Sequence, residues 1–166
     1  MFASHVRVGL GYDVHRIEAG RPLVLGGVRL ESPVGLAGHS DADAILHAVI
    51  DAVLGAVGRP DLGTMFPDTE DRWRGASSVD LARLACRPVL AEWEVANLDV
   101  VVRAESILIA PVRARLVEGI AAALEVPADR VNVKGKTGEG LGPVGEGKAL
   151  ECQALVCLVR RQENER

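Results

Sequence analysis

Residues 39–57 read HSDADAILHAVIDAVLGAV and carry the strongest secondary-structure signal of the chain. Between Asp41 and Val57 the apolar residues recur at helical spacing. They are Ala44, Ile45, Ala48, Val49, Ala52, Val53 and Ala56. This period predicts an amphipathic helix that begins at Ser40 or Asp41. Asp43, His47 and Asp51 follow one another at intervals of four residues, so the helix would hold three polar side chains on another face.

The segments around this helix mix strands and helices. Val6 to Val14 alternates as a strand does, and Leu23 to Leu30 predicts two short strands separated by Gly26 and Gly27. Further strands are predicted at 98–104, 131–134 and 150–160, and helices at 112–124 and from Ser77 or Ser78 to about Trp93. Pro88 should kink that last helix or end it early. The order predicts one α/β domain over residues 1–160, an α+β sandwich with helices over one face of a mixed sheet, followed by a frayed polar tail at 161–166.

Composition narrows the class of protein. The chain has 166 residues, enough to bury a hydrophobic core without stabilising disulfide bonds or metal ions. Its 3 cysteines are an odd number without a close pairing motif, which favours a reducing, cytoplasmic location. No apolar run reaches the length of a membrane span, and the segment before Arg7 is too short for a signal peptide. A net charge of -4 and 3% aromatic residues argue against a general nucleic-acid binder, so an anionic substrate would need local cations.

Three side chains form a candidate metal site. Asp13 and His15 lie two residues apart in the predicted first strand and therefore project from the same face. His47, on the rigid helix, is the best third ligand. One carboxylate and two imidazoles are used by catalytic zinc with one open position, and also by non-haem iron oxygenases. Asp51, one turn beyond His47, could hold the other imidazole nitrogen, although all four residues could instead be ordinary buried or solvated polar groups.

Residues 135–147 are rich in glycine, and residues 140–145 match the pattern G-x-G-x-x-G. A dinucleotide site is rejected because a strand pattern follows this run, whereas the dinucleotide motif opens a helix. What remains is a flexible turn preceded by Lys134, Lys136, Thr137 and Glu139. These residues could meet phosphate oxygens or a hard cation, or they could be scattered charges on a solvated hairpin.

Taken together, these motifs resemble the 2-C-methyl-D-erythritol 2,4-cyclodiphosphate synthase family over residues 6–158. The resemblance rests on Gly11-Tyr-Asp-Val-His15, His39-Ser-Asp with His47 and Asp51, Asp61-Leu-Gly63, Phe66-Pro-Asp-Thr69, and Val131-Asn-Val-Lys134 with Thr137 and Glu139. It implies a homotrimer with active sites between subunits. Each site would convert 4-diphosphocytidyl-2-C-methyl-D-erythritol 2-phosphate into the cyclic diphosphate and CMP, a step of non-mevalonate isoprenoid biosynthesis.

The same resemblance implies roles for individual residues. Asp13, His15 and His47 would bind zinc, and Glu139 would bind a second cation, magnesium or manganese. His39 and Thr137 would stabilise the transition state. The implied substrate-contacting positions are Ser40, Asp61, Leu62, Gly63, Phe66, Pro67, Asp68, Thr69, Glu70, Ala104, Leu108, Ile109, Ala110, Lys136, Gly138, Pro143 and Glu146.

Several positions depart from the family pattern. Ala42 stands where the family usually has glycine, and the lysine usually found in the nucleotide pocket is missing near Leu108. Lys136 could supply the lost positive charge. Pro143 replaces a usual aromatic residue and Glu146 a frequent arginine, so the resemblance determines neither how the base is recognised nor whether the trimer axis binds a ligand. A mononuclear non-haem iron enzyme and a non-catalytic, metal-free trimer are the two alternative interpretations.

Overall fold

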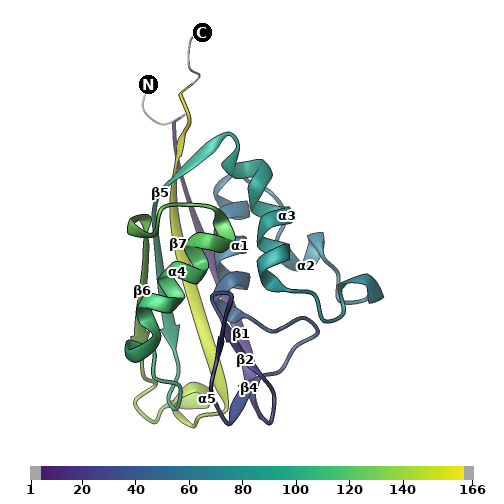
Figure 1. Ribbon diagram of the computed structural model, residues 1–166, viewed down its shortest axis with the longest axis vertical. Helices are drawn as coiled ribbons and strands as arrows, with labels where there is room; N and C mark the ends of the chain where they lie inside the picture. The colour runs from purple at the N-terminus through teal and green to yellow at the C-terminus, as the bar shows by residue number, and fades with distance from the viewer. Residues whose placement is uncertain (1–4, 163–166) are drawn as a thin grey trace.

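The computed structural model describes residues 5–162, in which a mixed five-stranded sheet carries helices on one face (Figure 1). The strands lie in the order β4-β1-β7-β5-β6, and only the pair β5 and β6 is parallel. A separate two-stranded hairpin consists of β2 and β3. The strands are β1 (Val6–Ala19), β2 (Leu23–Leu25), β3 (Val28–Leu30), β4 (Val34–Leu36), β5 (Trp93–Arg103), β6 (Val131–Lys136) and β7 (Ala149–Arg160). The predicted fold class is confirmed.

Three helices of 12 or 13 residues cover the sheet. Helix α1 packs on β1 and β7, α4 packs on β6, and α3 packs on α1 and α4. Short helices and 3-10 turns occupy the connections. The helical elements are α1 (Ala44–Ala56), α2 (Leu62–Met65), η1 (Asp71–Trp73), α3 (Ser78–Leu90), η2 (Ala110–Val112), α4 (Arg113–Leu124), η3 (Ala128–Arg130) and α5 (Gly142–Gly145).

Two glycines of β1 let α1 lie unusually close to the sheet. A Cβ atom at Gly9 would come within 1.9 Å of the Ala52 carbonyl oxygen, and one at Gly11 within 1.8 Å of the Ala48 carbonyl oxygen. Larger side chains on either element would push the helix away. This close approach also sets the distance between Asp13, the next inward residue of β1, and the first turn of α1.

The first turn of α1 differs from the prediction. The helix begins at Ala44 and is capped by Asp43, not by Ser40 or Asp41. One carboxylate oxygen of Asp43 accepts hydrogen bonds from the amides of Ile45 and Leu46, each at 3.1 Å. The same carboxylate accepts from Gly26 N at 2.8 Å and Gly27 N at 2.6 Å. Asp43 is thus fully buried and belongs to the core, not to a polar helix face with His47 and Asp51.

Other boundaries shift as well. Strand β1 continues to Ala19, β5 begins at Trp93, and α3 ends at Leu90 with Pro88 in its last turn. The predicted glycine-rich turn contains α5, and β4 and α2 were not predicted. The expected tail is also anchored at its start, because the Arg161 side chain donates to the Leu90 carbonyl at 3.0 Å. The remainder of that tail, 163–166, lies outside the described residues.

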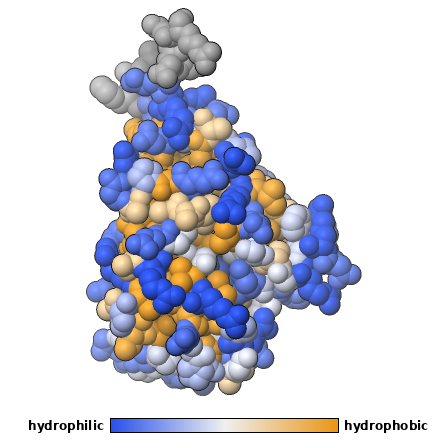
Figure 2. Space-filling view, viewed as in Figure 1, coloured by the Kyte–Doolittle hydropathy of each residue, from blue (hydrophilic) through white to orange (hydrophobic). Residues whose placement is uncertain are grey.

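The face of β1 and β7 that points away from the helices is apolar and open. Because Gly9 and Gly11 face α1, the alternate residues of β1 face the other side of the sheet. Leu10 is 67% exposed and Val8 60% exposed. The other exposed apolar side chains here are Val6, Tyr12, Val14 and Leu155. A contiguous apolar strip of this kind is typical of a surface that another protein covers. Figure 2 shows the side of the molecule on which the helices lie, and there hydrophobic patches are interspersed with hydrophilic residues.

Candidate active site

Asp13, His15 and His47 meet at the junction of β1 and α1. His15 Nε2 lies 2.9 Å from Asp13 Oδ2, and His47 Nδ1 lies 3.0 Å from the same oxygen. The two imidazole nitrogens are 3.2 Å apart. One ligand atom from each residue lies within 4.8 Å of the others, and among residues 5–162 no other group of three such side chains meets this condition. The geometry is that of three ligands around one cation.

The protonation of this cluster follows from its contacts. Burial alone would favour the neutral acid, but the hydrogen bond from His15, together with the adjacent imidazole of His47, holds the pKa of Asp13 well below its ordinary value. The pKa of His15 is raised, because the attraction of Asp13 outweighs the effect of burial. His15 Nδ1 lies 2.6 Å from the Ala37 carbonyl, so this nitrogen donates there and Nε2 faces Asp13. Asp13 is therefore an ionised carboxylate that favours a proton on His15, and a bound cation would take the place of that proton.

The spacing of four residues predicted that Asp51 holds the imidazole of His47, but the structure shows a different partner. Its carboxylate accepts a hydrogen bond from Leu62 N at 2.7 Å and so fixes the start of α2. The second imidazole nitrogen of His47, Nε2, instead lies 3.3 Å from Ser40 Oγ and 3.0 Å from Ser78 Oγ. Ser78 belongs to none of the predicted site motifs, and only its position at the start of a predicted helix is a signal in the sequence.

The new role of Asp51 gives a testable result. Asp51→Asn should leave metal content unchanged, because the side chain does not touch His47. It should lower the free energy of unfolding by about 1 kcal/mol, since the amide of Leu62 would lose a charged acceptor. Metal analysis and thermal unfolding measure the two effects. Loss of bound metal in this variant would return Asp51 to the site.

A cavity of about 520 Å³ opens from the cluster. Asp61 shapes its wall, since its side chain accepts from Thr64 N at 2.8 Å and caps α2. The cavity is lined by His39, the expected transition-state-stabilising residue, and by the expected substrate residues Ser40, Asp61, Leu62, Gly63, Phe66 and Asp68. Pro67, Thr69 and Glu70 belong to the same loop but do not line the cavity. Trp73 and Arg74, which were not predicted, do line it, and Arg74 is a cation at the site of an expected anion. Trp73 packs edge-on against Phe66, with ring centroids 4.9 Å apart.

A second cavity, of about 420 Å³, lies between the loop after β5 and the end of β6. It is lined by the expected residues Ala104, Leu108, Ile109, Ala110, Lys136 and Thr137, and also by Ile107, Arg113, Val133, Lys134 and Gly135. Leu108 is 69% exposed. Beside this cavity, Thr137 Oγ1 donates to Glu139 at 2.7 Å, and Gly138 N donates to Glu105 at 2.8 Å. Lys134, Lys136 and Arg113 make it the more cationic of the two cavities.

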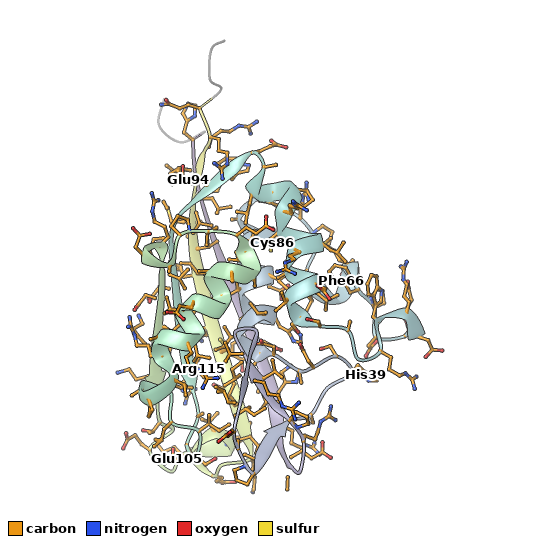
Figure 3. All side chains as sticks on the ribbon, in the orientation of Figure 1. His39, Phe66, Cys86, Glu94, Glu105 and Arg115 are labelled. Carbon is orange, nitrogen blue, oxygen red and sulfur yellow. The ribbon has the colours of Figure 1, made fainter. Side chains whose placement is uncertain are left out.

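The two cavities lie apart within one chain. They share no lining residue, and Glu139 does not belong to the cluster of Asp13, His15 and His47. Figure 3 places His39 and Phe66 in the right half of the molecule and Glu105 at the lower left. Pro143 and Glu146 line neither of these two cavities, and their expected contact with substrate stays a prediction. Glu146 pairs with Lys148 at 2.6 Å.

Residues 6–159 match the model of the YgbB family. The chain belongs to this family. A YgbB family relative from Rubrobacter xylanophilus, named 2-C-methyl-D-erythritol 2,4-cyclodiphosphate synthase, is 52% identical over 158 residues, which cover 93% of this chain and 95% of the relative. The resemblance predicted from the motifs is confirmed.

Solved structures of family members have the same fold. A Plasmodium falciparum protein in complex with CDP superposes with a TM-score of 0.84 at 35% identity, over 95% of this chain and 98% of that chain. A bifunctional protein from Campylobacter jejuni gives a TM-score of 0.90 at 34% identity, and this chain spans 43% of its length. Within residues 5–162 of this chain, no helix has the length and apolar character needed to cross a membrane.

Proposed function

We propose that this chain is a 2-C-methyl-D-erythritol 2,4-cyclodiphosphate synthase. It would cyclise 4-diphosphocytidyl-2-C-methyl-D-erythritol 2-phosphate and release CMP, with residues 1–160 as one catalytic domain. The observation that carries the proposal is the cluster of Asp13, His15 and His47, whose ligand atoms lie within 4.8 Å of one another beside a cavity, in a chain 52% identical to a protein of that name.

Zinc fits the cluster. Two imidazoles and one carboxylate are a common set of ligands for catalytic zinc. Nδ1 of His15, the nitrogen that would not bind the metal, already donates to the Ala37 carbonyl, as is usual for a histidine ligand. When bound, zinc supplies a positive charge with one position left for substrate. A second, harder cation, magnesium or manganese, would be held by Glu139, with most of its remaining ligands coming from phosphate oxygens and water.

The reaction needs no side chain that acts as a general base to activate the nucleophile. The attacking group is the 2-phosphate of the substrate, which is already anionic at neutral pH, so no activated serine or cysteine is needed. Catalysis consists of bringing two anionic phosphates together and stabilising the charge that develops as CMP leaves. The proposed parts are the two cations, with His39 and Thr137 as hydrogen-bond donors to the phosphates. Arg74, whose guanidinium pairs with Asp71 at 2.8 Å, also lies along the wall of the first cavity.

The active site would be completed by a neighbouring subunit. Within one chain the cluster and the cationic second cavity are separate, yet the substrate must reach both. We infer a cyclic homotrimer in which the first cavity of one subunit faces the second cavity of the next. The open apolar strip of β1 and β7 supports this, because residues such as Val8 and Leu10 would be buried around the three-fold axis.

Turnover and metal content test the proposal together. The purified protein is incubated with the cytidyl substrate and Mg²⁺, and the release of CMP and of the cyclic diphosphate is followed. Metal analysis of protein purified without added metal should find zinc. Iron in its place would favour the oxygenase alternative, and a protein with neither metal nor turnover would favour the non-catalytic trimer.

The cysteines Cys86, Cys152 and Cys157 are all unpaired, which supports a cytoplasmic location.

Lys136 should compensate for the missing pocket lysine. It lines the second cavity together with Leu108, near which the lysine usual in the family is missing. Lys136→Ala should weaken CMP binding about two- to five-fold at low salt and less at high salt, as expected for an exposed charge that ions can screen. Calorimetric titration with CMP measures this. Lys148→Ala is the matched control, since Lys148 lies outside this cavity and pairs with Glu146. Equal CMP affinity of Lys136→Ala and the parent at low salt would contradict the idea.

A further inference from the structure

The first residue of α3 lies against the imidazole of His47. Ser78 is fully buried, and its Oγ lies 3.0 Å from His47 Nε2. The hydroxyl of Ser78 donates to one carboxylate oxygen of Asp41, and Ser78 N donates to the other oxygen at 2.9 Å. Asp41, Ser78 and His47 therefore form a continuous chain of hydrogen bonds that leads to the candidate metal site.

The number of hydrogens that these groups carry determines which of them donates in each of these hydrogen bonds. A serine hydroxyl carries one hydrogen, and a carboxylate only accepts. Because the hydrogen of Ser78 points to Asp41, the Ser78 oxygen can meet His47 only as an acceptor. Nε2 of His47 must then carry a hydrogen. In the neutral ring the other nitrogen, Nδ1, keeps its lone pair, and this is the atom that lies 3.0 Å from Asp13 and 3.2 Å from His15.

We propose that Ser78 and Asp41 are positioning residues for the metal, which fix the ring orientation and the tautomer of His47. The inference rests on the proposed zinc site and adds to it the groups that prepare one of its ligands. Such outer partners raise the basicity of a ligand and hold it in place. The two histidines are anchored differently, because His15 donates to the backbone carbonyl of Ala37, whereas His47 depends on two side chains.

A nucleophilic role for Ser78 does not fit the geometry. Ser78, His47 and Asp13 have the connectivity of a hydrolase triad, with His47 between a hydroxyl and a carboxylate. The Ser78 side chain, however, has no exposed surface and does not line the cavity, so a substrate could not reach its oxygen. Ser40, the other hydroxyl near Nε2, is more distant at 3.3 Å and accepts from Ala42 N.

Backbone contacts should keep this region in place when the hydroxyl is removed. Gly75 N donates to the His39 carbonyl at 2.9 Å, and Asp41 N donates to the Ala76 carbonyl at 3.2 Å. Together with the bond from Ser78 N to Asp41, they join the segments 39–41 and 75–78 without the Ser78 side chain. The effect of Ser78→Ala on the metal can therefore be read apart from the fold.

The experiment compares zinc affinity by competition with a chromophoric chelator. Ser78→Ala should lower the affinity about 10- to 100-fold, the usual effect of losing an outer partner of a metal ligand. Ser77→Ala is the matched control, because Ser77 sits at the adjacent N-cap position and its side chain makes no capping hydrogen bond. Its zinc affinity should equal that of the parent. Asp41→Asn, which leaves one oxygen to accept from both donors of Ser78, should give a smaller loss.

Nitrogen-15 NMR of the zinc-loaded parent provides a measurement that needs no variant. The His47 ring should carry its hydrogen on Nε2 and bind zinc through Nδ1. The opposite assignment, or zinc affinities of Ser78→Ala and Asp41→Asn equal to that of the parent, would overturn the inference while leaving the zinc site intact. A parent protein that binds no zinc would instead refute the proposed function.

Discussion

His47→Ala is expected to lower turnover by about a thousand-fold or more while the fold stays intact. His47 contributes Nδ1 to the cluster, and its loss leaves only Asp13 and His15, too few to hold zinc with catalytic geometry. A thousand-fold loss corresponds to about 4 kcal/mol of transition-state stabilisation, a reasonable share for a cation that faces phosphate. The core should tolerate the change, because α1 is fixed by Ile45, Val49, Val53 and other buried apolar residues.

Three measurements are needed for this variant. Zinc content should fall with activity, and circular dichroism should match that of the parent. His5→Ala is the control, since this exposed histidine lies outside both cavities. If His47→Ala keeps its activity with zinc content unchanged, the three residues are not the zinc ligands.

The cluster could be predicted from sequence because short-range regularities determine it. Two residues of one strand must share a face, and a helix with small apolar residues at regular spacing must turn that face to the sheet. Gly9 and Gly11 then allow the close approach that brings His47 to Asp13. Each of these steps depends only on the period of a strand or helix and on the size of side chains.

The start of α1 could not be predicted in the same way. Ser40, Asp41 and Asp43 are all residues that cap helices, so local preference does not choose among them. The choice is made by a tertiary contact, because the carboxylate of Asp43 also accepts from the amides of Gly26 and Gly27 in the β2–β3 hairpin. Asp41 instead binds the start of α3.

The hydrogen-bond partner of His47 could not be predicted from the sequence either. A spacing of four residues placed Asp51 on the same side of α1, yet spacing cannot show which donor a carboxylate will meet. Leu62 N meets Asp51, and the imidazole meets Ser78, 31 residues away. Trp73 and Arg74 likewise enter the first cavity only because the loop after α2 folds back over it.

The separation of the two cavities predicts that neither half of the site works alone. His47→Ala subunits would lack the zinc half, and Glu139→Ala subunits the second cation. Each variant should form inactive trimers. Unfolding, mixing and refolding the two in equal amounts would create boundaries at which an intact cluster from one subunit faces an intact Glu139 from the next. Activity should therefore reappear in the mixture.

The size of the recovery follows from the symmetry. In a closed three-fold ring with random mixing, each boundary has about one chance in four of joining the two intact halves, so about a quarter of the parent activity should return. A mixture of His47→Ala with Asp13→Ala is the control, because both changes damage the same half and no boundary can be complete. Native mass spectrometry verifies that hybrid trimers have formed. Hybrid trimers that remain as inactive as the two parents would place the whole site within one subunit, and the separate cavities would then have to be joined by a movement within the chain.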